Sequence, residues 1–277
     1  MKKRVLVAVV FVPIFFVVLF FLPPYVLAAV FAAICAISAY ELLHAIGIKG
    51  NGRIGVYAMI AAALIPIGAY FNFGALVFRV VLLVLMCLMF IEAVIAFKTQ
   101  RQIMFAQILV ALFGGAIIPY MLSSLISLSV MPEGRLLVLI PVICAFVTDG
   151  GAYFTGVLFG KRHAFPLVSP KKTVEGCIGG LVAGMAAMAI YGLIINLTTI
   201  HEINFWVLIL YGLVGAVVTE LGDLAFSLVK REYDIKDYGK LLPGHGGMLD
   251  RFDSMVFTAP AMYLLVSVLP AVVVLSD

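Results

Sequence analysis

Apolar residues run along almost the whole chain in long segments, and polar residues gather in the short stretches between them. A helix that crosses a bilayer needs about 20 apolar residues, and these segments lack the period-two alternation of strands. The pattern therefore predicts about nine membrane-spanning helices. They are expected at 4–22, 25–46, 54–71, 75–97, 104–129, 135–159, 174–198, 204–228 and 255–275.

Composition indicates the same fold class. Of the 277 residues, 65% are hydrophobic and 12% are charged, with a mean hydropathy of +1.21, which excludes a soluble fold. We therefore expect an all-α polytopic membrane protein, because helices satisfy their own backbone polar groups in lipid. The first segment exceeds the apolar core of a signal peptide and is expected to be a retained anchor. The four cysteines lack metal-ligand spacing and are expected to be packing residues.

Lysine and arginine set the expected orientation. A cytoplasmic N-terminus places all 18 basic residues on the cytoplasmic side except Arg79 and Arg135, as the positive-inside rule requires. On this topology the polar stretches 160–173 and 230–253 both face the cytoplasm. The net charge of +4 reflects this bias, and we expect no nucleic-acid partner.

The stretch 227–253 concentrates charge and glycine in a chain with few charges elsewhere. Charge is costly beside a bilayer, so its concentration in one place indicates function. The eighth segment leads into this stretch with Glu220, Asp223, Ser227 and Lys230, which recur at three- or four-residue spacing on one helix face. Such a stripe suits metal and phosphate binding, and a polar seam between packed helices is the alternative.

Two further acids open the ninth segment. Asp250 and Asp253 lie one helical turn apart, where acids also complement the helix dipole. Just before them come His245, Gly246 and Gly247, and clustered glycines let backbone N–H groups bind an anion. A flexible loop is the plainer interpretation of these glycines.

Asp149 and a pair of lysines complete the candidate residues. Asp149 is expected near the middle of the membrane, where an ionised Asp costs about 2.5–3.5 kcal/mol and a functional role is the default. A hydrogen-bonded contact between helices is the alternative. Lys171 and Lys172 are expected to open the seventh helix beside a capping hydroxyl, within the stretch from Ser169 to Glu175 that could cap it, at a position that would also hold phosphate.

The acids suit divalent metal, and the bases suit phosphate. Two Mg²⁺ ions about 3.5–4 Å apart would clamp the attacking and leaving oxygens of an in-line displacement. Because the site would open to the cytoplasm but begin within the bilayer, we expect one soluble nucleotide substrate and one lipid substrate. Glu41 and Glu92 have no motif around them and are expected only to pack or to snorkel.

The fixed residues form a long pattern: Ser227-x2-Lys230-Arg231-x4-Lys236-Asp237-x-Gly239-x2-Leu242-Pro243-x-His245-Gly246-Gly247-x2-Asp250-Arg251-x-Asp253. This pattern resembles the signature of the phosphatidate cytidylyltransferase (CDP-diacylglycerol synthase) family. Asp149-x2-Ala152-Tyr153-x2-Gly156, Ser169–Gly176 and Gly222-Asp223 are similar to further blocks of that family. The resemblance covers about 148–260, and it divides the chain into N-terminal transmembrane helices, 1–130, and a catalytic transmembrane region, 131–277.

The resemblance implies transfer of CMP from CTP to phosphatidate, giving CDP-diacylglycerol and pyrophosphate, in the plasma (inner) membrane of a bacterium. It implies Mg²⁺ ligation by Asp223 and Asp250, assisted by Asp253 and Asp149, and it is compatible with a second type of cation and with a homodimer. Catalytic roles fall to Asp223, Asp250, Lys230 and Arg231. Substrate-binding roles fall to Lys171, Lys172, Ser227, Lys236, His245, Gly246, Gly247 and Arg251.

Other functions fit parts of the pattern. A CTP-dependent polyisoprenol kinase of the dolichol type resembles the same nucleotide block and would release CDP instead of pyrophosphate. A transporter would use Asp149, Glu41 and Glu92 as an ion path, but it leaves 227–253 without a role. A phosphatidyl-alcohol transferase is disfavoured, because its D-G-x2-A-R pattern is absent and Tyr153 follows Ala152.

Overall fold

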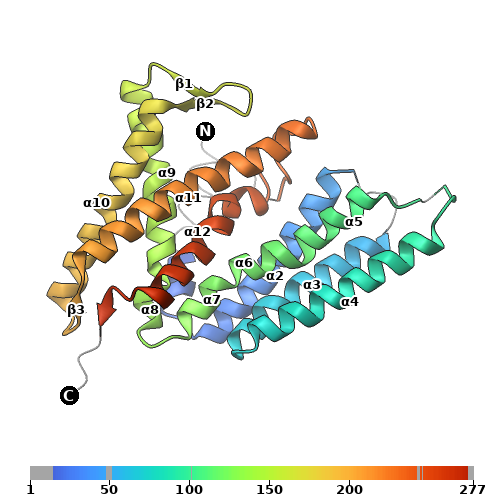
Figure 1. The fold of residues 1–277 in the computed structure, drawn as a ribbon, viewed down its shortest axis with the longest axis horizontal. Helices are drawn as coiled ribbons and strands as arrows, with labels where there is room; N and C mark the ends of the chain where they lie inside the picture. The colour runs from blue at the N-terminus through green and yellow to red at the C-terminus, as the bar shows by residue number, and fades with distance from the viewer. Residues whose placement is uncertain (1–14, 48–51, 101, 242–243, 245, 274–277) are drawn as a thin grey trace. The chain divides into compact units, whose positions relative to one another are not determined.

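The computed structural model describes residues 15–47, 52–100, 102–241, 244 and 246–273. The described chain is mainly helical and divides into two compact units (Figure 1). Unit 1 extends to Arg135 and includes Glu232–Phe252, whereas unit 2 consists of Leu136–Arg231 and the chain from Asp253 onward. Residues 227–253 form one continuous pattern in the sequence, and we call them the signature stretch. This stretch is therefore divided between the two units.

Each unit has its own set of helices. Unit 1 contains α2 (Pro24–Ala45), α3 (Gly52–Tyr70), α4 (Gly74–Ile95), α5 (Phe105–Leu112), the π-helical turn η1 (Phe113–Ile117), α6 (Ile118–Leu122) and α7 (Ser124–Ser129). Unit 2 contains α9 (Leu139–Phe159), β1 (His163–Phe165), β2 (Ser169–Thr173), α10 (Val174–Thr198), β3 (Glu202–Ile203), α11 (Phe205–Glu232) and β4 (Val272–Val273). Three helices cross the boundary: α8 (Gly134–Leu137), α12 (Leu249–Val268) and, by its last residue, α11.

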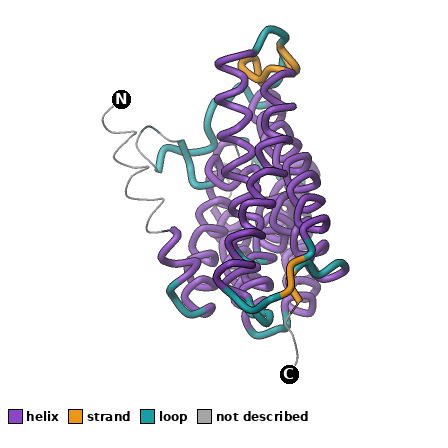
Figure 2. The backbone as a smooth tube through the Cα atoms, turned by 90° about the vertical axis from the view of Figure 1, so that its left-hand side faces the viewer, coloured by secondary structure: helices purple, strands orange, loops and turns teal. Residues whose placement is uncertain are grey.

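Glycine and alanine bring the helices of unit 2 close together. A Cβ at Gly212 of α11 would lie 2.6 Å from the Gly184 carbonyl oxygen of α10. A Cβ at Gly180 of α10 would lie 3.1 Å from the Ala152 Cβ of α9. Small residues give membrane helices this close approach, because lipid supplies no hydrophobic force between them. Figure 2 shows the paired strands of unit 2 at opposite ends of its helices.

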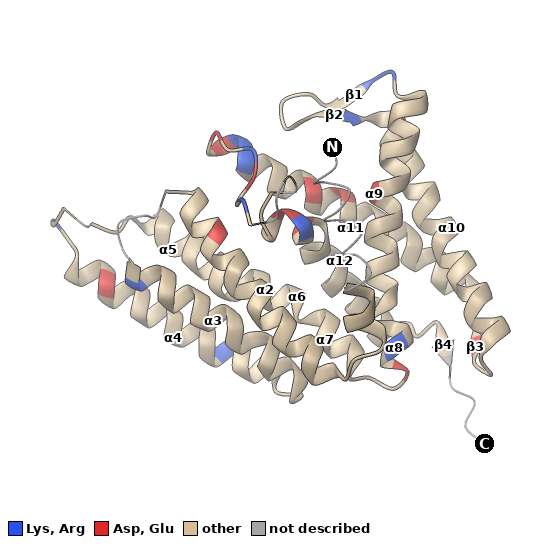
Figure 3. Ribbon diagram, turned by 180° about the vertical axis from the view of Figure 1, so that it is seen from behind, with Lys and Arg blue, Asp and Glu red and all other residues tan. Residues whose placement is uncertain are grey.

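Apolar side chains fill the interior of unit 1. Ile54, Ile65 and Met89 are fully buried in a cluster shared by α3 and α4. The π-helical turn joins this cluster at Gly115, where a Cβ would lie 3.0 Å from both the Ala58 Cα and the Leu85 Cδ2. Figure 3 shows the helices of unit 1 without Lys, Arg, Asp or Glu along most of their length, as expected for segments that lie in lipid.

Seven of the nine expected spans are confirmed as helices long and apolar enough to cross a membrane, within the described part of the chain. The expected ninth span is helix α12, which begins earlier, at Leu249, and is not among the seven. Its first five residues include Asp250, Arg251 and Asp253, so its apolar remainder falls short of about 20 residues. The expected first span lies mostly outside the described residues, although 15–20 are helical.

The expected seventh span, 174–198, is confirmed as helix α10 (Val174–Thr198), but the expectation that Lys171 and Lys172 open this helix is wrong. Lys171 and Lys172 lie in strand β2, because Ser169 pairs with Phe165 in an antiparallel hairpin. Helix α10 begins after this hairpin, and its N-cap is Thr173, whose Oγ1 accepts the Gly176 N–H at 3.1 Å. The cap residue therefore lies within the stretch from Ser169 to Glu175 that the sequence indicated.

Thr173→Ala is expected to lower the free energy of unfolding by about 1 kcal/mol, because alanine cannot accept the Gly176 N–H. Thermal unfolding in detergent measures the loss. Thr198→Ala is the matched control, since its exposed hydroxyl bonds only to the Ile194 carbonyl in the last turn of the same helix. Equal losses in the two variants would contradict the capping role.

Candidate active site

Polar residues of unit 2 come together from four elements of the fold. We name this group the acid–lysine cluster: Asp149 of α9, Lys172 of β2, Glu220, Asp223 and Lys230 of α11, and Asp253 of α12. The sequence predicted all of these as polar residues of the site except Glu220, which it placed on the same helix stripe. That stripe is confirmed as part of one continuous helix, α11.

Lys172 occupies the centre of the acid–lysine cluster. Its Nζ lies 3.1 Å from Asp223 Oδ2 and 4.0 Å from Glu220 Oε2, and it donates to the Glu220 carbonyl oxygen at 3.4 Å. Its side chain is 11% exposed, whereas that of Asp223 is 36% exposed. The neighbouring Lys171 is exposed, since successive strand residues point to opposite faces. The two lysines, equivalent in the sequence, are therefore different in the fold.

A close backbone contact places Asp253 beside α11. A Cβ at Gly222 would lie 3.1 Å from the Asp253 carbonyl oxygen and from the Ser254 Cα, so only glycine allows this approach. Lys230 of α11 forms an ion pair with Asp253 at 3.6 Å, and both side chains are largely buried. The Gly222-Asp223 pair of the sequence thus has two roles: the glycine admits α12, and the acid faces Lys172.

Asp149 contributes a third carboxylate to the acid–lysine cluster. It accepts a hydrogen bond from the Ser254 hydroxyl at 3.4 Å and interacts electrostatically with Asp223, Asp253 and Lys172. The helix around it is unbroken, and Gly151 packs against Ala183 of α10. Close helix packing therefore explains the glycine at Gly151.

The acid–lysine cluster has the donor chemistry that magnesium requires. Its carboxylates are hard oxygen ligands, and one buried oxygen, Glu220 Oε1, has no hydrogen-bond partner, although the Cys177 thiol interacts with the same carboxylate. In the described part of the chain, no three acids, histidines or cysteines are grouped to hold a metal by themselves. Magnesium is commonly bound by one or two carboxylates with water and substrate phosphates, so the cluster fits that mode.

Asp250 organises a loop in unit 1. Its Oδ2 accepts the N–H groups of Tyr238 at 2.8 Å and Gly247 at 2.9 Å. Gly246 has a φ of 83°, in the left-handed region that favours glycine. The carboxylate of Asp250 is thus already used in holding backbone, and its shared metal ligation with Asp223 stays a prediction.

Sequence reasoning missed a residue at this loop. Glu41 neither snorkels nor simply packs: its Oε2 accepts the Leu249 N–H at 3.0 Å, and the residue is 5% exposed. A buried acid at the end of an apolar helix was the available signal, because such residues are costly unless they have partners. Glu92, the other acid expected to pack, pairs with Arg53 at 3.4 Å and with the Tyr57 hydroxyl at 3.2 Å.

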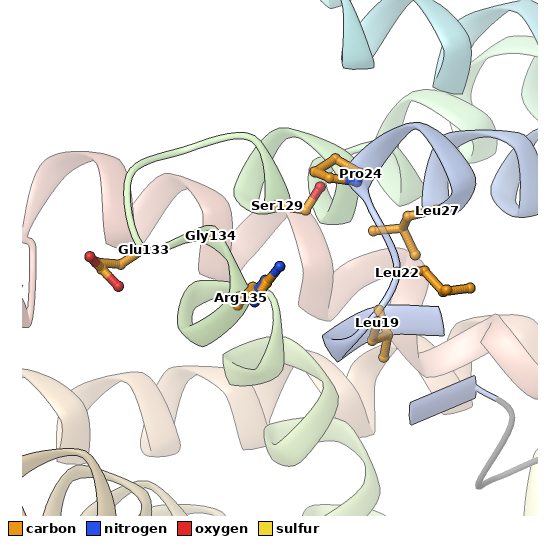
Figure 4. A pocket seen from close by; sticks show the side chains of 8 residues that line it. All are labelled: Leu19, Leu22, Pro24, Leu27, Ser129, Glu133, Gly134 and Arg135. Atoms are coloured by element: carbon orange, nitrogen blue, oxygen red, sulfur yellow. The ribbon is translucent and has the colours of Figure 1, made fainter. Parts of the chain in front are cut away.

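Unit 1 also contains two cavities. One, of about 680 Å³, lies between the end of α2 and residues 235–241, and Lys236 and Lys240 line it together with Glu41. The other has a volume of about 250 Å³, and leucines of residues 19–27 and Arg135 line it. Figure 4 shows that the carboxylate of Glu133, which also lines this cavity, is turned away from Arg135. Of these two cavities among the described residues, the first combines two lysines, an acid and signature residues.

Comparison with known proteins identifies the family. A family model described as the Cytidylyltransferase family matches residues 2–269. The chain belongs to the cytidylyltransferase family. It is 48% identical to the phosphatidate cytidylyltransferase of Bacillus subtilis over 120 residues, which cover 43% of each chain. The Staphylococcus epidermidis (strain RP62A) protein of the same name is 39% identical over 133 residues, 48% of this chain and 50% of that protein.

Similarity to a third relative extends over the whole chain. The Thermotoga maritima phosphatidate cytidylyltransferase is 33% identical over 275 residues, 99% of this chain and 98% of that protein. The chain therefore aligns with about half the length of the first two relatives and nearly all of the third.

The remaining signature residues of this member of the family take varied positions. Ser227 is half-buried on α11, and the Arg231 Nε donates to the Val168 carbonyl oxygen at 3.2 Å. Arg251 is exposed in the first turn of α12, and Lys236 is exposed at the larger cavity. His245 lies outside the described residues.

Proposed function

We propose that the protein transfers CMP from CTP to phosphatidate, forming CDP-diacylglycerol and releasing pyrophosphate. The full-length similarity to the Thermotoga maritima enzyme supports this choice of substrates. The observation that carries the chemistry is the position of Lys172, 3.1 Å from Asp223 and beside Glu220. A buried cation among acids suits a site in which two anionic phosphates must be brought together.

In the proposed reaction, a phosphate oxygen of phosphatidate forms a bond to the α-phosphorus of CTP, and the bond from that phosphorus to the bridging oxygen breaks. Asp223 would hold Mg²⁺ with Asp253 and Asp149. When bound, the ion would neutralise charge on phosphate oxygens. Lys172 and Lys230 would orient the phosphates and offset their mutual repulsion.

Before substrate binds, the same lysines serve another purpose. Lys172 separates the like charges of Glu220 and Asp223, and Lys230 neutralises Asp253. Each acid therefore has a cation partner in a low-dielectric environment, where an unpaired charge is costly. Substrate phosphates would take over these lysines and release carboxylate oxygens for the metal.

The proposed enzyme works at the cytoplasmic face of a bacterial plasma membrane, with about nine spanning helices and its N-terminus in the cytoplasm. The apolar helices and the bacterial relatives support this location. Phosphatidate would enter from the lipid and CTP from the cytoplasm. A homodimer stays a prediction of the sequence.

Position-specific labelling of CTP tests the proposed reaction. Purified protein is incubated with phosphatidate, Mg²⁺ and CTP that is labelled on either the α- or the γ-phosphate. We expect the α label in extracted lipid and the γ label in pyrophosphate, with EDTA abolishing both. Transfer of the γ label to lipid, with release of CDP, would identify a kinase and contradict the proposal.

A further inference from the structure

Glu41 lies far in the sequence from every residue of the signature, yet it contacts the signature loop inside unit 1. It belongs to α2, in the N-terminal half of the chain, and is 5% exposed. Its Oε2 accepts the Leu249 N–H at 3.0 Å, and the carboxylate also interacts with the Met248 N–H. A carboxylate that accepts backbone N–H groups at the start of α12 fixes where that helix begins.

Two signature glycines give the Glu41 side chain its space. At Gly239 and at Gly247, the three atoms nearest to an added Cβ all belong to the end of the Glu41 side chain, and both positions would collide with it. Neither glycine has a positive φ, so backbone conformation does not require glycine at either position. The glycines are therefore explained by the acid that lies between them.

The same acid lines the larger cavity of unit 1. Lys236 and Lys240 belong to the segment 235–241 that forms one wall, and Glu41 belongs to the opposite wall. Holding Gly239 against Glu41 therefore sets the position of both cations. Those cations suit a triphosphate. Loss of the Glu41 contact should therefore weaken binding of the nucleotide more than binding of the lipid.

We propose that Glu41 is a positioning residue for the reaction: it holds the described parts of the signature loop, residues 236–241 and 246–249, and the start of α12 so that these residues can bind CTP. This inference rests on the proposed function. It gives the N-terminal helices a specific part in positioning the substrate. Glu41 acts through the backbone of the loop and not on the reacting atoms.

Three variants test the proposal: Glu41→Ala, Glu41→Gln and the control Glu92→Ala. Glu92 is a buried acid of the same unit whose partners are Arg53 and Tyr57. Loss of a charge-assisted hydrogen bond predicts that Glu41→Ala raises the KM for CTP by about 10- to 100-fold and leaves the KM for phosphatidate nearly unchanged. Glu41→Gln keeps an acceptor oxygen and should recover most of this loss.

Hydrogen exchange gives a readout that does not depend on activity. Peptides covering 236–249 should exchange faster in Glu41→Ala than in the unmodified protein or in Glu92→Ala, whose exchange changes near residues 53 and 57 instead. If the unmodified protein makes no CDP-lipid, the proposed function fails, and the exchange experiment still decides whether Glu41 holds the loop. Unchanged exchange in 236–249, or faster exchange with unchanged kinetics, would overturn the proposal.

A double-mutant cycle with Gly239→Ala checks the contact itself. All three nearest neighbours of an added Cβ at Gly239 are Glu41 atoms, so Gly239→Ala alone should raise the KM for CTP by about tenfold. In the Glu41→Ala background the clash is absent, and the second substitution should add almost nothing. Fully additive effects would contradict a direct contact between these residues.

Discussion

Asp223→Asn is expected to reduce formation of the CDP-lipid by about 10²- to 10³-fold while the protein remains folded. Asparagine keeps the shape of the side chain but removes the negative charge that would attract Mg²⁺ and that pairs with Lys172 at 3.1 Å. Turnover of labelled CTP at saturating phosphatidate measures the loss. Raising the concentration of Mg²⁺ should recover part of it.

Asp234→Asn is the matched control for this substitution. Asp234 is an exposed acid of unit 1 with a φ of 52°, a conformation that asparagine also adopts readily. Its turnover should equal that of the unmodified protein. If Asp223→Asn also turned over CTP at the rate of the unmodified protein, the metal-binding role of α11 would be contradicted.

The second large effect is expected at Lys172. Lys172→Ala leaves Glu220 and Asp223 without their cation, so we expect a loss of about 3 kcal/mol in unfolding free energy and about 10²-fold in turnover. Lys171→Ala, the adjacent and exposed variant, should leave stability nearly unchanged and should lower turnover less than Lys172→Ala does. Thermal unfolding and CTP turnover measure both variants.

Lys172→Arg separates stability from catalysis. Arginine keeps the positive charge beside the two acids but cannot place a single ammonium among them, so stability should recover more than turnover. Equal effects of Lys171→Ala and Lys172→Ala would show that the two lysines act only as general positive charge at the membrane.

Much of the fold was predictable because apolar runs in a membrane protein have one structural solution. Lipid offers the backbone no hydrogen bonds, so long apolar segments become helices, and seven of the expected spans are confirmed. The stripe on α11 was predictable for the same reason, since helical spacing fixes which residues share a face. Asp223 and Lys230 therefore lie on the helix that the sequence indicated.

Local patterns could not predict contacts between distant parts of the chain. The stretch Ser169–Thr173 has lysines and a hydroxyl that suit a helix start, but pairing with β1 makes it a strand. Glu41 reaches a loop 208 residues away, and no spacing rule connects the two. Gly247 was expected to belong to an anion-binding loop, whereas within unit 1 it makes room for that acid, as Gly239 also does.

Binding of Mn²⁺, an oxygen-seeking stand-in for Mg²⁺, tests most directly whether the acids around Lys172 gather divalent metal. Electron paramagnetic resonance of the detergent-solubilised protein reports the bound fraction. We expect Mn²⁺ to bind, to be displaced by Mg²⁺, and to bind at least about tenfold more weakly to Asp223→Asn than to Glu92→Gln. Equal affinity in the two variants would contradict the assignment of the metal to this cluster.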